Sequence, residues 1–183
     1  MILDRLNKLP NQAQFMRKAN PPVKLLLVLI LSSSYFMPAA QAANTVASIY
    51  DGDTLTLNNG AKVRLLQIDT PELSSSECYG QEAKQALIKL VGKSQVILEG
   101  DAASADRDRY GRYLRYVFVG KKNLNLELVK IGAAAPYFYQ GEKGKYSTEL
   151  LKAAEKAKSK KLGLWGQCAK TQLIPTKALD TKN

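Results

Sequence analysis

The chain has 183 residues, which is enough for one domain with a proper core and barely enough for two. Its 27 lysines and arginines against 16 acidic residues give a net charge of +11, which favours polyanionic partners such as nucleic acid or an anionic membrane surface. The absence of histidine excludes mechanisms that need an imidazole base or a histidine ligand to zinc. Any hydrolysis must therefore use carboxylates, arginines and a hard metal ion, or an unusual base such as lysine.

Residues 1–42 have the pattern of a secretory signal peptide. Basic residues precede the apolar run Leu25–Leu31, and Ala40 and Ala42 fit an A-x-A site, so we expect cleavage after Ala42. The run is shorter than the roughly 20 apolar residues of a transmembrane helix, although the long basic region leaves an uncleaved anchor open. We therefore expect an exported protein, secreted or periplasmic. Residues 43–166 would form one folded domain, and residues 167–183 a polar, frayed tail.

The rest of the chain alternates short strands with helices. Alternation and turn residues predict five strands, at Thr45–Tyr50, Thr54–Leu57, Lys62–Ile68, Gln95–Glu99 and Tyr113–Val119. Apolar residues at helical spacing predict three helices, from Tyr79 to about Val91, from about Leu124 to Ile131, and from Ser147, the expected N-cap, to just before Gly163. This order predicts an α+β fold, a five-stranded OB-type β-barrel, closed or nearly closed, with about three packed helices.

The two cysteines, Cys78 and Cys168, have two interpretations. In a reducing cytosol they would be free thiols, whereas in an exported protein they favour a single disulfide. Such a bridge would tie the loop around Cys78 to the C-terminal end of the domain.

Acidic residues gather at two strand ends. Asp51-Gly52-Asp53-Thr54 lies at the turn between the first two strands, and Asp69-Thr70-Pro71-Glu72 follows the third. Carboxylates from two loops together with a backbone carbonyl are the ligands that a hard cation such as Ca²⁺ prefers. An EF-hand is excluded, because Lys62 or Arg64 would stand at the position of its bidentate glutamate. Taken singly, the two segments also fit a plain hairpin turn and a helix-entry cap.

Two arginines stand out in the period-2 patterns of this sequence. Period-2 alternation puts Arg64 on one face with Leu66 and Ile68, and Arg112 opens a similar alternation after Tyr110-Gly111. An arginine so placed is either paired with a carboxylate, Asp69 or Asp108, in a structural ion pair or held for a ligand. Two guanidiniums near a metal ion suit a phosphodiester, since each can bind phosphate oxygens in a bidentate manner.

Five segments together resemble the staphylococcal nuclease (thermonuclease) family, and the resemblance runs from about Val46 to Trp165. They are Asp51-Gly52-Asp53-Thr54, Arg64-Leu65-Leu66-Gln67-Ile68-Asp69-Thr70-Pro71-Glu72, Tyr79-Gly80-Gln81-Glu82-Ala83, Asp108-Arg109-Tyr110-Gly111-Arg112 and Leu162-Gly163-Leu164-Trp165. A single segment of this kind is weak evidence for the family, but five segments in the family's order and with fitting spacing are specific evidence.

The resemblance implies a role for each of several residues. Asp53 and Asp69 would be the side-chain ligands of Ca²⁺, and Thr70 would add its backbone carbonyl. By the same resemblance the remaining assignments are Glu72 as general base, Arg64 and Arg112 as phosphate-binding arginines, and Tyr137, Tyr139 and Arg109 as substrate-binding residues. The two tyrosines also fit ordinary packing or surface positions.

The sequence therefore predicts a calcium-dependent phosphodiesterase that hydrolyses DNA and RNA, with single strands preferred. The resemblance implies water attack on phosphorus, a 5′-oxygen leaving group and 3′-phosphate products, in a monomer with no protein partner. One alternative is a catalytically inactive OB-barrel that only binds nucleic acid. Another is an anchored envelope protein whose basic surface faces lipid.

Overall fold

The structure, a computed structural model, describes residues 43–75 and 77–182. The predicted signal peptide lies outside these residues. None of the helices within the described ranges has the length and apolar character needed to cross a bilayer.

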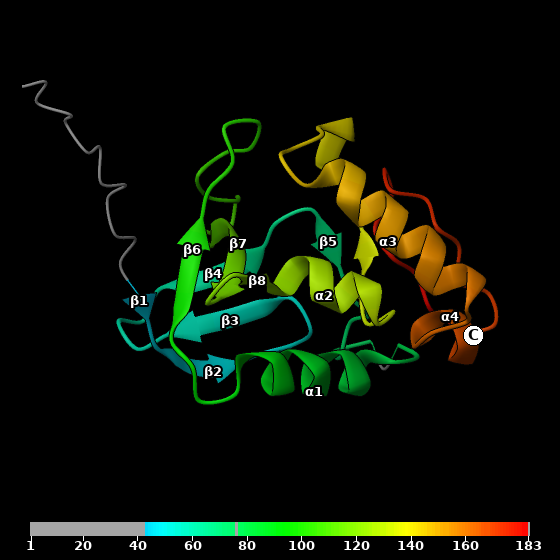
Figure 1. The fold of residues 1–183 in the computed structure, drawn as a ribbon, viewed down its shortest axis with the longest axis horizontal. Coiled ribbons are helices and arrows are strands. Elements are labelled where there is room, and N and C mark those ends of the chain that lie inside the picture. The colour runs from blue at the N-terminus through cyan, green and yellow to red at the C-terminus, as the bar shows by residue number, and fades with distance from the viewer. Residues whose placement is uncertain (1–42, 76, 183) are drawn as a thin grey trace, which may run out of the picture. The chain divides into compact units, whose positions relative to one another are not determined.

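The described residues form a mixed α+β fold around one large sheet and a small one (Figure 1). The large sheet has the strand order β1-β6-β7-β4-β3-β2, with β8 paired to β7, and the small one pairs β5 with β9. Their bounds are β1 Ala43–Asn44, β2 Val46–Ile49, β3 Thr54–Leu57, β4 Lys62–Leu65, β5 Ile68–Asp69, β6 Val96–Glu99, β7 Tyr113–Val119, β8 Lys122–Asn123 and β9 Ala135–Pro136. The pairing of β4 with β7 is parallel and the other pairings are antiparallel.

The sheet is OB-like but is not a closed ring of hydrogen-bonded strands. Its two ends, β1 and β2, are separated in the chain only by Thr45, and they pair with β6 and β3 respectively. One extended segment therefore supplies both edges of the sheet. The expected α+β, OB-type class is confirmed, and the complete closure of the barrel is not seen.

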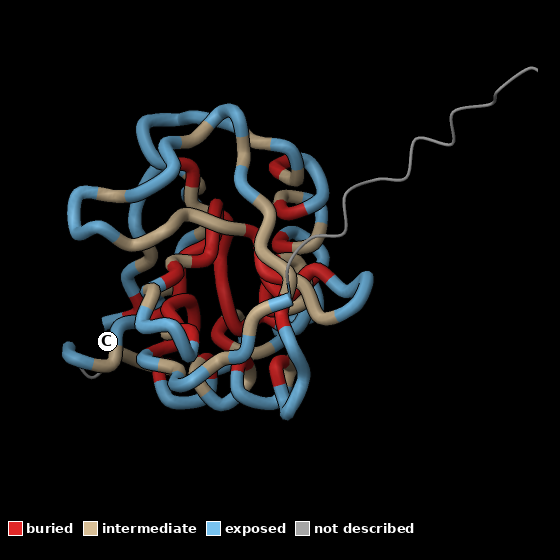
Figure 2. Tube along the Cα trace, turned by 90° about the vertical axis from the view of Figure 1, so that its left-hand side faces the viewer, coloured by how far each residue is buried: buried red, intermediate tan, exposed pale blue. Residues whose placement is uncertain are grey.

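Within residues 43–75 and 77–182, three helices and two short helical segments accompany the sheet. They are α1 Gly80–Val91, α2 Leu124–Lys130, η1 Tyr139–Gly141, α3 Ser147–Ser159 and α4 Leu164–Gln167. Helix α1 buries Ala83, Leu87 and Val91, which recur at the spacing of one helix face. These join buried strand residues in a single core, drawn in red at the centre of Figure 2. The prediction that Ser147 is an N-cap is wrong, because Ser147 is already helical and Tyr146 precedes it.

The predicted third strand is interrupted before it reaches Asp69. Strand β4 ends at Leu65, a turn follows, and Gln67 takes a φ of 57°, which sends the chain into the separate strand β5. Internal partners hold this turn, since Asn125 Nδ2 donates to the Leu66 carbonyl and the Tyr116 hydroxyl shares its proton between Gln67 Oε1 and Asp101 Oδ2. The alternation expected through Ile68 is therefore wrong, because these tertiary hydrogen bonds stabilise a turn that the apolar pattern does not show.

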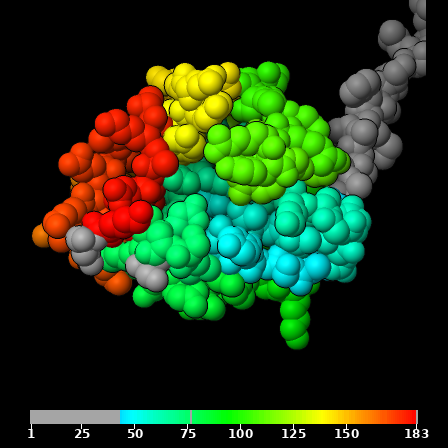
Figure 3. All heavy atoms as spheres, turned by 180° about the vertical axis from the view of Figure 1, so that it is seen from behind, coloured from blue at the N-terminus to red at the C-terminus, as the bar shows by residue number. Residues whose placement is uncertain are grey.

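The segment after α4 packs against the body. The disulfide between Cys78 and Cys168 is present, as expected for an exported protein. Farther along, the Phe138 N–H donates to the Pro175 carbonyl at 2.6 Å, and Thr181 is buried. Figure 3 shows the red C-terminal segment lying beside the green segment of residues in the seventies. The expectation of a frayed tail is wrong, because the disulfide, the Pro175 contact and the hydrogen bond from the Thr181 hydroxyl to the Cys78 carbonyl attach the tail at several points.

Candidate active site

The turn that ends β2 places Asp53 inside the protein. The Asp53 N–H donates to Asp51 Oδ1 at 3.0 Å, which fixes the turn, and the backbone N–H and hydroxyl of Thr70 both donate to Asp53 Oδ2. Gly52 is required here, because a Cβ at this position would lie 2.8 Å from side-chain atoms of Thr70 and Ala83. The two acidic segments of the sequence therefore meet in space, as expected.

Arg64 lies between the two predicted metal-binding aspartates. Its Nε is 3.1 Å from Asp53 Oδ1, and its Nη2 is 2.6 Å from Asp69 Oδ1. Its Nη1 donates to the carbonyls of Leu65 and Ile68 at 2.8 Å each, so the guanidinium also spans the turn between β4 and β5. The structure thus contains the ion pairs of the structural interpretation, and it also fixes the guanidinium at the edge of a cavity.

Glu72 is exposed just beyond this cluster. Its backbone N–H donates to Glu77 Oε2, while its own carboxylate makes no hydrogen bond within the described residues. Burial and the negative charge of Asp53 raise the pKa of Glu72, partly offset by Arg64 and Arg112. An exposed carboxylate with a raised pKa takes up a proton more readily than an ordinary glutamate does.

Arg112, the residue just before β7, reaches the same region. Asp108 accepts both its backbone N–H and its Nε, at 3.0 and 2.7 Å. Its Nη1 donates to the Thr54 hydroxyl at 3.3 Å, and this hydroxyl donates to Asp53 Oδ1. The sheet register explains the meeting, since Thr54 pairs with Arg64 across β3 and β4, and Arg64 pairs with Leu114 of β7.

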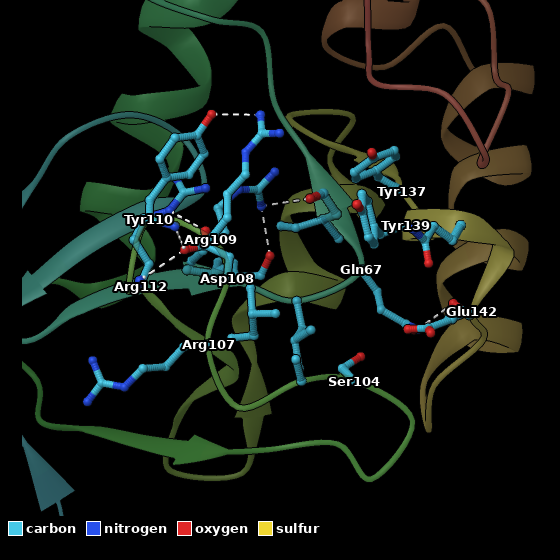
Figure 4. A pocket seen from close by; sticks show the side chains of 17 residues that line it. Gln67, Ser104, Arg107, Asp108, Arg109, Tyr110, Arg112, Tyr137, Tyr139 and Glu142 are labelled. Atoms are coloured by element: carbon cyan, nitrogen blue, oxygen red, sulfur yellow. Dashed lines mark hydrogen bonds and ion pairs between the residues drawn. The ribbon is translucent and has the colours of Figure 1, made fainter.

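A cavity of about 550 Å³ opens beside the two arginines (Figure 4). Arg109 and Tyr110 lie with Arg112 on one side of it, and Tyr137 and Tyr139 on the other. The Tyr137 N–H donates to the Gln67 carbonyl, which holds the segment after β9 against the turn. Arg64 and Arg112 line this cavity, whereas Asp53, Asp69 and Glu72 do not. Arg64 is therefore the direct link between the acidic cluster and the cavity.

Sequence reasoning named most of these residues but missed three. Thr54 and Tyr110 stood inside the recognised segments without a role, and here Thr54 contacts Arg112 and Tyr110 lines the cavity. Asp108 was a carboxylate of the ion-pair interpretation, and it does pair with Arg112. Leu179 carried no signal at all, yet its backbone N–H donates to Asp69 Oδ2 at 2.7 Å. The Leu179 amide is 110 residues from Asp69 in the chain, and a backbone amide contact of this kind cannot be predicted from residue type.

The electrostatics of the cluster favour a cation. Burial raises the pKa of Asp51 and of Asp69 to about 6, and the charge of Asp53 adds to the effect at both. Arg64 offsets the shift at Asp69 only in part. Several carboxylates thus surround one guanidinium, and their mutual repulsion is what a divalent cation relieves.

The donor set fits a hard cation that retains water. Among the described residues, no three acidic or cysteine side chains converge as an all-protein metal cage. Asp53 and Asp69 supply two carboxylates, and the hydrogen bonds of Thr70 to Asp53 bring its backbone close to them. Carboxylate, carbonyl and water oxygens are the usual ligands of Ca²⁺.

The comparison with known families agrees with this geometry. The family described as "Staphylococcal nuclease homologue" matches residues 62–167, more than half of the chain. The chain belongs to the staphylococcal nuclease family. Family membership supports nuclease activity, in line with a site of carboxylates and arginines without histidine.

Several curated proteins are similar over most of the chain. An uncharacterized endonuclease of Haemophilus influenzae is 40% identical over 77% of this chain and 77% of its own length. The thermonuclease of Staphylococcus hyicus is 30% identical over 83% of this chain and 87% of its own. The SPbeta prophage-derived endonuclease YokF of Bacillus subtilis is 35% identical over 67% of this chain, which spans only 44% of that relative.

Proposed function

We propose that this chain is a calcium-dependent endonuclease that hydrolyses the phosphodiester bonds of DNA and RNA. The observation that carries the proposal is the position of Arg64, which contacts Asp53 and Asp69 and also lines the tyrosine cavity. A nucleotide in the cavity would therefore have its phosphate next to the acidic cluster. The names of the endonuclease and thermonuclease relatives support the same activity.

The substrate phosphate would bind between Arg64 and Arg112. Asp108 holds Arg112 through its Nε, so the outer part of this guanidinium faces the cavity with a fixed orientation. Guanidiniums fixed before the substrate arrives stabilise the charge of the pentacoordinate transition state without reorganisation. Tyr110, Tyr137 and Tyr139 line the cavity, and Arg109 adds positive charge. Aromatic rings that stack on bases tolerate any sequence, which favours unpaired strands of either sugar type.

Glu72 would act as the general base. Its carboxylate is exposed and its pKa is raised, so it can take a proton from a water held nearby. Asp53, Asp69 and the Thr70 carbonyl would hold Ca²⁺, which when bound would neutralise phosphate charge and position that water. The resemblance to the family implies departure of the 5′-oxygen and products that carry 3′-phosphates.

We further propose that the protein acts outside the cytoplasm as a monomer. The disulfide between Cys78 and Cys168 supports an oxidising compartment, and the pattern of residues 1–42 supports export. N-terminal sequencing of protein from expressing cells tests this, with Ala43 as the expected first residue. An intact N-terminus in the membrane fraction would instead indicate an anchored protein, and size-exclusion chromatography with light scattering would reveal any dimer.

The decisive experiment compares cleavage and binding in one series. Labelled single-stranded DNA and RNA are incubated with the full chain in Ca²⁺, Mg²⁺ or EDTA, and product ends are analysed. We expect cleavage only with Ca²⁺, and Glu72→Gln to lose at least about 10²-fold in kcat while still binding DNA. Glu155→Gln, on the exposed face of α3, is the matched control and should keep full activity.

Two results would overturn the proposal. Full activity in EDTA would show that cleavage needs no metal ion. Salt-sensitive binding of nucleic acid without turnover in the parent chain would indicate the catalytically inactive OB-barrel.

A further inference from the structure

The C-terminal segment is attached to Cys78 near both of its ends. Cys168 is bonded to Cys78 through the disulfide, and the Thr181 hydroxyl donates to the Cys78 carbonyl at 2.9 Å. We call residues 168–182 the C-terminal strap. Figure 1 shows this segment, in red, running from α4 behind α3. The chain between the two attachments is short, so the strap stays close to the body even when its central contacts are broken.

Between these attachments, two backbone groups of the strap form hydrogen bonds with other parts of the described chain. The Pro175 carbonyl accepts the Phe138 N–H, and the Leu179 N–H donates to Asp69 Oδ2 at 2.7 Å. The first contact joins the strap to the segment that also carries the cavity tyrosines. The second ends directly on an aspartate that the proposed function assigns to metal binding.

The Leu179 contact adds a donor on the second carboxylate oxygen of Asp69. Its Oδ1 already accepts from Arg64 at 2.6 Å, so both carboxylate oxygens are engaged when the strap is docked. An N–H group and a cation both approach a carboxylate with positive charge, and they compete for the same oxygen lone pairs. The Leu179 N–H occupies one lone pair of Oδ2 and withdraws negative charge from it, so Asp69 binds a metal ion less strongly while Leu179 is in place.

We propose that the C-terminal strap is an autoinhibitory segment that competes with the metal ion for Asp69, an inference that rests on the proposed function. In the docked state the affinity for Ca²⁺ is lowered. By linkage, Ca²⁺ binding lowers the affinity of the body for the strap by the same factor and releases it. The tether makes docking intramolecular, so one hydrogen bond to a charged group, worth about ten- to a hundredfold in an equilibrium constant, is enough to matter.

The first test removes the donor and leaves the rest of the strap in place. Leu179→Pro deletes the N–H, and Ala178→Pro is the matched control because the Ala178 amide makes no hydrogen bond within the described residues. Isothermal titration of the full chain with Ca²⁺ should give about tenfold tighter binding for Leu179→Pro and a change below about twofold for Ala178→Pro. Thr181→Val, which loosens only the end of the strap, should shift binding in the same direction by less.

The second test measures release of the strap without any turnover. Endoproteinase Lys-C cleavage after Lys177, followed by mass spectrometry, should become faster when Ca²⁺ is added to the parent chain. In Leu179→Pro, cleavage should already be fast in EDTA and respond little to Ca²⁺.

The outcomes separate the strap from the proposed function. Equal or weaker Ca²⁺ binding in Leu179→Pro, or protection of Lys177 by Ca²⁺, would show that Leu179 orients Asp69 for the metal, and the strap proposal fails alone. Absence of Ca²⁺ binding in the parent and in every variant would overturn the proposed function together with the strap.

Discussion

At the scale of single residues, Arg64 connects three features of the site. Its guanidinium contacts Asp53, Asp69 and two backbone carbonyls of the turn, and it also faces the cavity. A lysine could keep the charge, but its single ammonium cannot reproduce this planar set of donors. The geometry of the site therefore depends on guanidinium shape as well as on charge.

Arg64→Lys should consequently lower kcat for single-stranded DNA by about 10²–10³-fold, because a fixed donor to the phosphate is lost. Arg115→Lys is the control, since Arg115 pairs with Asp106 and does not line the cavity. Circular dichroism and thermal unfolding of both variants establish whether they fold. Parent-level turnover in Arg64→Lys would show that charge alone suffices.

Asp101 provides a pH-dependent contribution to stability away from the acidic cluster. Burial would raise the pKa of Asp101, but hydrogen bonds from the backbone N–H groups of Ala103 and Lys145 and from the Tyr116 hydroxyl outweigh it, so the pKa lies below the ordinary 3.8. Because the folded-state pKa is the lower one, this stability is present above pH 3.8 and is lost as the pH falls through the folded-state value.

Asp101→Asn should therefore lower the free energy of unfolding at pH 7 by about 1–3 kcal/mol. The difference from the parent should shrink below pH 3.8, where the parent carboxylate becomes protonated too. Urea unfolding at pH 7 and at pH 3 measures both values. A difference that does not depend on pH would assign the loss to shape rather than to charge.

At the scale of elements, the end of α2 and the link between α3 and α4 pack backbone to backbone. The Leu164 N–H donates to the Gly132 carbonyl at 2.9 Å, and a Cβ on Gly132 would lie 2.2 Å from the Leu162 carbonyl oxygen. Gly132 also has a φ of +72°, which L-residues with a side chain rarely adopt. Glycine is needed here both for conformation and for the close approach of the two segments.

Gly132→Ala should lower the free energy of unfolding by more than about 3 kcal/mol, because backbone strain and overpacking add. Gly120→Ala is a matched control with a φ of +57°, and a Cβ on Gly120 would have no atom within 4 Å, so it should cost only about 1–2 kcal/mol. Chemical denaturation of the two variants separates conformation from packing. Equal losses would show that the close approach relaxes without cost.

At the scale of the whole molecule, the disulfide joins the loop beside the site to the start of the strap. Cys78 and Cys168 are 90 positions apart in the chain, and the segment between them contains most of the folded domain. Removing both cysteines as Cys78→Ala/Cys168→Ala should lower stability by about 4–5 kcal/mol in the chain-entropy model. The melting temperature with and without reductant measures this in the parent, and the double variant should be insensitive to reductant. An unchanged melting temperature on reduction would contradict it.

Local pattern was enough for much of this protein. Helix α1 was predictable because Ala83, Leu87 and Val91 repeat on one face, and β3 because short strands flanked by turn residues have few alternatives. The short motifs around Asp53, Asp69 and Arg112 identified the family, since residue type and order within a motif are properties of the sequence itself.

Other features depend on partners far away in the chain, and only the tertiary structure decided them. The break of the third strand at Gln67 depends on Tyr116 and Asn125, which satisfy the turn from other elements. The docking of the tail depends on the amide of Leu179 meeting Asp69, and a backbone N–H is the same at every non-proline residue. Sequence therefore determined the family, the elements and the reactive side chains, whereas the fold determined which of their atoms are already engaged, because hydrogen bonds between distant segments follow from three-dimensional position and not from residue type.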